Sequence, residues 1–114
     1  MTIREVATLL SADVLNGEDL LDTNIVSACG SDMMSDVLAM VKDQAVLLTG
    51  LANPQVVRTA LMMDMKCVCF VRGKLPDDKT IQLAKENNII LLTTKEKMFT
   101  ACGKLYSAGI IGGM

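Results

Sequence analysis

Histidine is absent from this 114-residue sequence, and so is tryptophan. The missing imidazole removes Ser-His and Cys-His nucleophile pairs, imidazole acid-base catalysis and the commonest metal ligand. No Walker or dinucleotide fingerprint occurs either, because the residues after Gly50 read Leu-Ala-Asn-Pro, which matches neither spacing. We therefore expect no catalytic residues, no cofactor and no metal site, and we expect that the chain is not an enzyme.

Aromatic and basic residues are also scarce. The chain has two Phe and one Tyr, and its 11 basic and 13 acidic residues give a net charge of −2. Two of the three aromatic residues are expected to pack in the core. Binding to nucleic acid needs a basic face or a row of stacking rings, and neither is available here. We expect no nucleic-acid partner.

Long apolar runs are missing too. Runs such as residues 45–48 and 89–92 fall far short of the ~20 residues that cross a bilayer. The first residues lack the basic start and apolar stretch of a secretory signal, so we expect a cytoplasmic protein without a membrane partner. In a reducing compartment the four cysteines are expected to be free, mostly as small buried hydrophobes. Cys29, at a strand end, is the one expected to be exposed enough to sense redox state.

Hydrophobic residues make up 51% of the chain, which is enough to fill one core, and we expect a single domain over residues 1–114. Continuous apolar strands are predicted at 45–48, 67–71 and 89–92, so strand starts recur every 22 residues. That interval holds one strand and one helix, as a βαβ crossover requires. Continuous apolar strands are typical of parallel sheets with helices on both faces. The pattern predicts an α/β fold with a mostly parallel sheet of about five strands.

Further elements follow from capping and turn signals. Thr2 and Glu5 fit a capping box before a helix over 3–10, and apolar runs at 12–15 and 23–28 predict two strands at one edge. Ser31 and Asp32 are predicted to cap a helix whose apolar stripe extends to Val41. Three more helices are predicted over 53–64, 77–87 and 95–108. Gly103 lies inside the last of them, which indicates close contact with another backbone.

Polar residues follow the three clear strands, and the carboxyl ends of parallel strands lie on one side of a sheet, where ligands usually bind. Hydroxyls, glycine amides and cations would meet there and suit a small anionic ligand. The same residue types also serve ordinary strand-to-helix turns, and the sequence leaves both interpretations open. The candidate ligand-binding residues are Thr49, Gly50, Asn53, Arg72, Gly73, Lys74, Thr93, Thr94 and Lys95.

Four segments carry a family resemblance. They read CGSDMMSDVLA at 29–39, LLTGLANPQV at 47–56, FVRG at 70–73 and LTT at 92–94. In order and spacing they resemble stand-alone DRTGG-domain proteins from about Thr2 to Gly109. The Asp-Arg-Thr-Gly-Gly string that names the family does not occur, and Thr49-Gly50 is the part that matches. The resemblance implies a fold similar to the N-terminal domain of HPr kinase. It also implies a regulatory role, since relatives lie beside CBS pairs in some inorganic pyrophosphatases and in some phosphotransacetylases.

Three hypotheses follow. The first is a non-catalytic regulatory module that binds a nucleotide, another small anionic ligand or a partner protein at the strand ends. The second is a homodimeric interaction module without a ligand, which uses apolar surface near Met62, Met63 and the C-terminal tail. The third is an enzyme that uses Lys74 or Lys95 with Thr93, or a thiol redox protein that uses Cys29. A homo-oligomer, most simply a dimer, is expected because symmetric pairs are the commonest assemblies.

Overall fold

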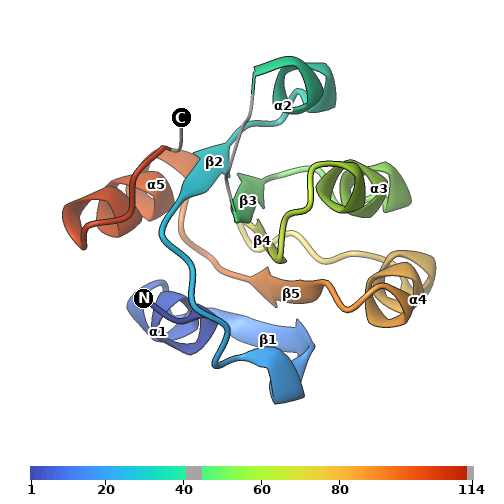
Figure 1. The fold of residues 1–114 in the computed structure, drawn as a ribbon, viewed down its shortest axis with the longest axis horizontal. Helices are drawn as coiled ribbons and strands as arrows, with labels where there is room; N and C mark the ends of the chain where they lie inside the picture. The colour runs from blue at the N-terminus through green and yellow to red at the C-terminus, as the bar shows by residue number, and fades with distance from the viewer. Residues whose placement is uncertain (41–44, 113–114) are drawn as a thin grey trace.

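A five-stranded sheet forms the centre of the fold, in the order β1-β5-β4-β3-β2 (Figure 1). The strands are β1 (Asp13–Asn16), β2 (Ala28–Gly30), β3 (Val46–Thr49), β4 (Cys67–Phe70) and β5 (Ile90–Thr93). Strands β2 to β5 run parallel, and β1 pairs antiparallel with β5. The predicted mostly parallel α/β sheet is confirmed. The structure is a computed structural model, and it describes residues 1–40 and 45–112.

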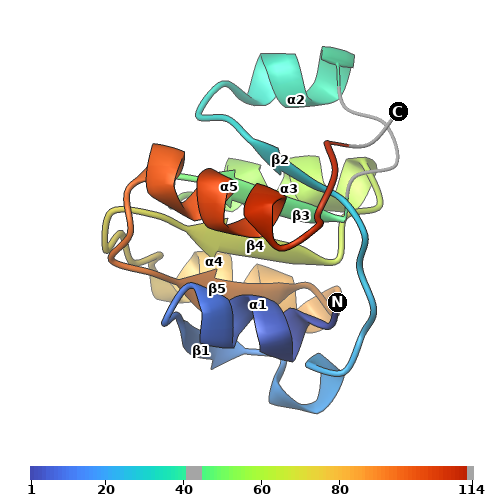
Figure 2. The same cartoon turned by 90° about the vertical axis from the view of Figure 1, so that its left-hand side faces the viewer.

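Helices cover both faces of the sheet (Figures 1 and 2). One face carries α1 (Ile3–Leu9) and α5 (Met98–Ser107), and the other carries α2 (Met34–Met40), α3 (Pro54–Met62) and α4 (Asp78–Glu86). A short 3-10 helix, η1 (Glu18–Leu20), follows β1. The capping box at Thr2 is present, as predicted, and the Asn53 side chain caps α3. Among the described residues, no helix is long and apolar enough to span a bilayer.

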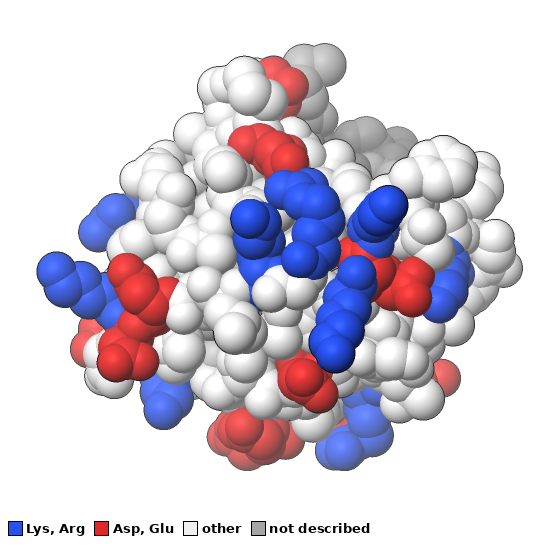
Figure 3. Space-filling model, turned by 180° about the vertical axis from the view of Figure 1, so that it is seen from behind, with Lys and Arg blue, Asp and Glu red and all other residues white. Residues whose placement is uncertain are grey.

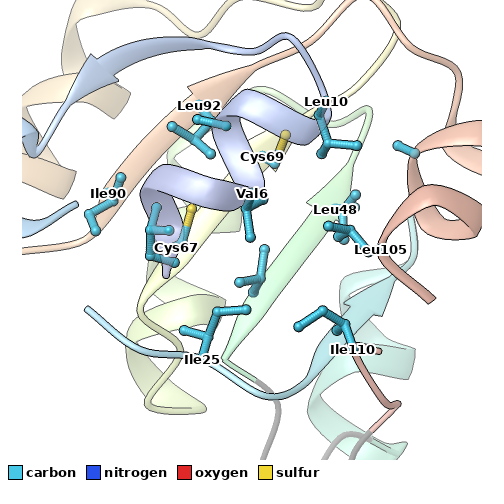
Figure 4. Close-up of a cluster of buried hydrophobic side chains, with 14 of the residues drawn as sticks. Val6, Leu10, Ile25, Leu48, Cys67, Cys69, Ile90, Leu92, Leu105 and Ile110 are labelled. Carbon is cyan, nitrogen blue, oxygen red and sulfur yellow. The ribbon is translucent and has the colours of Figure 1, made fainter. Parts of the chain in front are cut away.

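Two buried clusters flank the sheet because successive strand residues point to opposite faces. In β5, Ile90 and Leu92 pack toward α1 and α5, whereas Leu91 packs toward the other three helices. Cys67 and Cys69 join the first cluster, beneath Val6 of α1 and Leu10, which follows that helix (Figure 4). Both cysteines are buried, as the sequence predicted, and burial raises the pKa of the Cys69 thiol to about 12. Apart from Thr49 and Thr93 at the ends of β3 and β5, the central strands are apolar, because both of their faces are covered.

The prediction for the first two strands was wrong in two respects. β1 and β2 lie at opposite edges of the sheet, and β2 covers residues 28–30 instead of 23–28. Residues 24 to 27 are extended but make only isolated bridges, Thr2 with Asn24 and Ser27 with Ile111. Of the two β-branched residues there, Ile25 is buried in the cluster beneath α1 and its amide donates to the Met1 carbonyl, whereas Val26 is exposed.

The last helix also differs from its prediction. Phe70 is fully buried, but Phe99 and Tyr106 are 90% and 76% exposed, so only one of the three aromatic residues is in the core. Gly103 faces open space, with nothing within 4 Å of the position that a Cβ would occupy. The glycine packed against this helix is Gly30, where a Cβ would lie 2.5 Å from the Cys102 sulfur. Helical periodicity placed Ala101 and Leu105 on the buried side of α5 correctly. It could not show how much of the helix the sheet covers, and so it could not show that Phe99 and Tyr106 are exposed.

Candidate functional site

The carboxyl ends of β2 to β5 lie along one side of the molecule. We call the loops that follow them, residues 31–33, 50–53, 71–77 and 94–97, the rim. Figure 3 looks onto this face and shows Lys and Arg side chains gathered near its centre with acidic side chains beside them. The rim cations are Arg72, Lys74, Lys95 and Lys97. Three of these were predicted as ligand-binding residues, and the parallel register brings their loops to one face.

Thr49 ends β3 and Gly50 follows it, and both donate to the carboxylate of Asp32 in the loop after β2. The Gly50 amide donates to Asp32 Oδ1 at 2.6 Å, and the Thr49 hydroxyl donates to the same oxygen at 3.1 Å. The Thr49 hydroxyl also accepts from the Leu51 amide at 3.2 Å. The amide that we expected to receive an anion therefore already holds one, supplied by the chain itself.

Arg72 is placed by its backbone and by two neighbours. Its φ of +60° is in the left-handed region, which is unusual for a residue other than glycine. Its amide donates to the Glu96 carbonyl at 2.8 Å, which ties the loop after β4 to the loop after β5. The guanidinium lies directly against Gly50, in space that a side chain there would occupy. Its Nη1 reaches Asp32 Oδ2 at 3.5 Å, and 41% of the side chain stays exposed.

Asp32 is the rim residue that sequence reasoning placed wrongly. It does not cap α2, which begins at Met34, and it turns instead to β3 and β4. The Gly50 amide holds the pKa of this carboxyl below its ordinary value, helped by the Thr49 hydroxyl and by Arg72. Correct placement of β2 would have put Asp32 just beyond a strand end. The apolar stripe predicted for this helix ends at Val41, which lies outside the described residues.

The other half of the rim surrounds a hollow of about 380 Å³ between β1, β4 and β5. The predicted residues Gly73, Thr93, Thr94 and Lys95 line it, together with Leu10, Ser11, Asp13, Leu75 and Glu96. Both threonine hydroxyls are used within the chain, Thr93 donating to the Lys74 carbonyl and Thr94 to the Leu10 carbonyl, each at 2.7 Å. The Thr94 amide donates to the Phe70 carbonyl at 2.8 Å. The cationic side chain that lines this hollow is Lys95, and the carboxylates of Asp13 and Glu96 in the same lining counter its charge.

The predicted residues thus fall into two groups, with Lys74 and Asn53 outside both. Thr49, Gly50 and Arg72 meet at Asp32, whereas Gly73, Thr93, Thr94 and Lys95 border the hollow. Lys74 is exposed between them, on the loop after β4. Asn53 serves α3, its side chain accepting from the Val56 amide at 3.3 Å. Whether either group binds a ligand remains a prediction.

The cysteines offer less chemistry than the sequence suggested. Cys29 is half-buried, but Cys102 is equally accessible, so Cys29 is not the single candidate for redox sensing. Burial raises the pKa of both thiols, which disfavours the reactive thiolate. Within residues 1–40 and 45–112, no three His, Cys, Asp or Glu side chains come together as metal ligands.

Comparison with solved structures finds a protein of the same fold. The chain is similar to the crystal structure of the CBS and DRTGG domains of the regulatory region of Clostridium perfringens pyrophosphatase, complexed with its activator, diadenosine tetraphosphate. The TM-score is 0.70 at 20% sequence identity, over 91% of this chain and 45% of that chain. This chain therefore spans less than half of the one it matches. A search of curated protein sequences found no match.

The family model agrees with the fold and with the segments that first carried the resemblance. It is the model of the DRTGG domain, and it matches residues 5–108, which run from within α1 to the end of α5. The match includes the loops of the rim that follow all four parallel strands. The chain belongs to the DRTGG domain family.

Proposed function

We propose that this domain is a non-catalytic regulatory module that binds a small anionic ligand, such as a nucleotide or phosphorylated metabolite, at the rim. The observation that carries the proposal is the placement of Arg72, whose guanidinium is fixed over Gly50 while 41% of the side chain stays exposed. A guanidinium held in place offers a fork of donors suited to phosphate or carboxylate. Lys74, Lys95 and Lys97 add positive charge to the same loops.

Family membership supports a regulatory role. In the pyrophosphatase, a domain of this family is part of a regulatory region, and that region was crystallised with a nucleotide activator. The sequence supports the absence of catalysis, because general acid-base chemistry near neutral pH most often uses histidine and this chain has none. The rim hydroxyls of Thr93 and Thr94 donate to backbone carbonyls, which leaves neither paired with a base. We expect binding without turnover, in a cytoplasmic setting.

The test is replacement of Arg72 by alanine, with Lys85→Ala as the matched control. Both side chains are exposed cations, but Lys85 is in the last turn of α4, at the end of that helix far from the rim. A charge-assisted hydrogen bond contributes about 1.5–3 kcal/mol, so Arg72→Ala should weaken binding about ten-fold or more. Lys85→Ala should leave the affinity unchanged. A thermal-shift screen of nucleotides and phosphorylated metabolites would select the ligand, and isothermal titration calorimetry would measure its affinity.

Binding should also weaken as salt is added, because the attraction is electrostatic. If Arg72→Ala binds the ligand as tightly as the parent does, the ligand does not bind at the rim. A ligand found elsewhere, for instance at the amino ends of the strands, would contradict the proposal in the same way.

A second candidate function is homodimeric interaction, and the surface of α5 favours it. Exposed apolar residues, Phe99 on α5 and Ile111 in the tail, border an apolar groove of about 350 Å³ that Gly103 and Tyr106 also line. The Phe99 ring and the groove lie on the same surface. That surface of one chain can therefore pack against the same surface of a second chain, as a two-fold interface requires. The sequence had placed this interface near Met62, Met63 and the C-terminal tail. The tail residue Ile111 borders this groove, and α5 adds the exposed rings of Phe99 and Tyr106.

We expect the parent to show a dimeric mass by light scattering at tens of micromolar, and Phe99→Glu to show a monomeric one. At 90% exposure, Phe99 contributes little to the fold of one chain, so this variant should keep its circular dichroism spectrum. Glu18→Gln, an exposed change near the opposite edge of the sheet, serves as the control. A monomeric mass for the parent would rule out the dimer.

A further inference from the structure

Asp32 occupies the position where an incoming anion would otherwise meet the rim. Its Oδ1 accepts from the Gly50 amide at 2.6 Å and from the Thr49 hydroxyl at 3.1 Å. These two donors are buried, since Thr49 is 0% exposed, and Gly50 is buried with it. A phosphate that sought the same donors would have to displace a carboxylate already held there. It would also approach a like charge, which repels it.

The second carboxylate oxygen has a different environment. Asp32 Oδ2 lies 3.5 Å from Arg72 Nη1, at the long limit for a hydrogen bond, and 43% of the Asp32 side chain is exposed. Oδ2 therefore keeps lone pairs that solvent or a ligand can reach. Beside it, the guanidinium of Arg72 keeps donors that Asp32 does not use. An acceptor and a donor thus stand next to each other at the mouth of the rim.

We propose that Asp32 determines specificity: it keeps bare anions off the Gly50 amide and, with Arg72, selects ligands that carry a hydroxyl beside an anionic group. A ligand hydroxyl would donate to Oδ2, and the neighbouring phosphate or carboxylate would accept from the guanidinium. Sugar phosphates and the ribose of nucleotides have this chemistry, whereas inorganic phosphate does not. This inference rests on the proposed function, and it narrows the class of ligand.

The hydrogen bonds of the loop hold the Asp32 carboxylate in place for contact with a ligand. The Ser31 hydroxyl accepts from the Met33 amide at 3.0 Å, which closes a tight turn around Asp32. The Ser31 amide donates to the Leu48 carbonyl at 3.0 Å, which attaches this turn to β3. Gly50 leaves the space in which the guanidinium lies. Carboxylate and guanidinium are therefore set before any ligand arrives, which reduces the entropic cost of binding.

The experiment compares two probes on two proteins. Ribose 5-phosphate and inorganic phosphate are titrated into the parent and into Asp32→Asn by isothermal titration calorimetry. Asparagine has nearly the same shape and can still accept from the Gly50 amide, but it lacks the negative charge. The control is Asp36→Asn, which removes an exposed charge from the first turn of α2. Thermal melting shows whether each variant is folded at the temperature of the titration.

We expect the parent to bind ribose 5-phosphate about ten-fold more tightly than inorganic phosphate. In Asp32→Asn this preference should shrink to about three-fold or less, because phosphate binding improves while the hydroxyl loses a charged acceptor. Asp36→Asn should behave as the parent does. These changes in opposite directions for the two probes would not arise from a merely structural role, which would weaken both together.

Other outcomes overturn the inference, and they separate it from the proposed function. Equal affinity of the parent for both probes, or an equal change for both in Asp32→Asn, would show that Asp32 does not select the ligand. The proposed function would survive that result if the binding still depended on Arg72. Binding of neither probe to either protein also overturns the inference, and Arg72→Ala with the screened ligand then judges the proposed function separately.

Discussion

Phe70→Ala is expected to lower the free energy of unfolding by about 3–5 kcal/mol, the usual cost of removing a buried phenylalanine side chain. Phe70 is fully buried at the end of β4, in the cluster beneath α2, α3 and α4. Its neighbours there include Leu91 of β5 and Val57 of α3, so truncation leaves a cavity between two layers. Domains are commonly stable by only about 5–15 kcal/mol, so this variant should lose a large share of its stability.

Phe99→Ala is the matched control, since it removes the same side chain from a position that is 90% exposed. We expect a change within about 0.5 kcal/mol. Urea denaturation followed by circular dichroism would measure both variants, at a protein concentration where light scattering shows one chain. The slope m should stay the same in both, because the surface exposed on unfolding hardly changes. Similar losses for the two variants would contradict the division between core and surface described above.

Thiol labelling should divide the four cysteines into two pairs. With a chromogenic thiol reagent at pH 8, we expect Cys29 and Cys102, both half-buried, to react in the folded protein. Cys67 and Cys69 are fully buried, and burial raises the pKa of Cys69 from 9.0 to about 12. At pH 8 only about one Cys69 in 10⁴ would be a thiolate, and the reagent would also have to wait for the sheet to open. Labelling of this pair should be slower by a factor of about 10³ or more.

In denaturant all four thiols should react rapidly. A Cys29→Ala, Cys102→Ala double variant supplies the control, because it should lose the fast phase and keep the slow one. A fast phase that consumes three or four thiols would show that β4 is more accessible than this fold allows.

The raised pKa of Cys69 also has a consequence for stability, since the folded state holds the Cys69 proton more tightly than the unfolded state does. The contribution of the protonated Cys69 thiol to the free energy of unfolding should be fully present below pH 9, and it should be lost as the pH rises toward 12.

Asp32 shows why the candidate site was only partly predictable. The sequence identified the strand ends at Thr49, Arg72 and Thr93, because continuous apolar runs and turn residues are local signals. Asp32 was interpreted as a helix cap because Asp before an apolar stripe is a common capping pattern. Its actual partners lie 17, 18 and 40 residues away, at Thr49, Gly50 and Arg72. No local pattern reports contacts at such separations.

The two aromatic residues of α5 make the same point for the surface. Helical periodicity placed Ala101 and Leu105 on the buried stripe, and the structure agrees. It could not decide how wide that stripe is, because the width depends on how much of the sheet lies beneath the helix. β2, at the edge of the sheet, is only three residues long, and the Cys102 side chain already lies against Gly30. Phe99 and Tyr106 lie outside the buried stripe and are exposed to solvent, beside an apolar groove.

The class of fold, the repeated βα units and the caps at Thr2 and Asn53 could be inferred from the sequence, since each depends on residues close together in the chain. The order of the strands could not be inferred in this way. β1 is placed beside β5 and β2 at the opposite edge by pairing between segments far apart in the chain. Tertiary structure also decided that Asp32, and not solvent or a ligand, faces the Gly50 amide. The physical reason is that a carboxylate within reach of a buried amide and a fixed guanidinium is more stable there than in water, and only the assembled sheet brings those donors together.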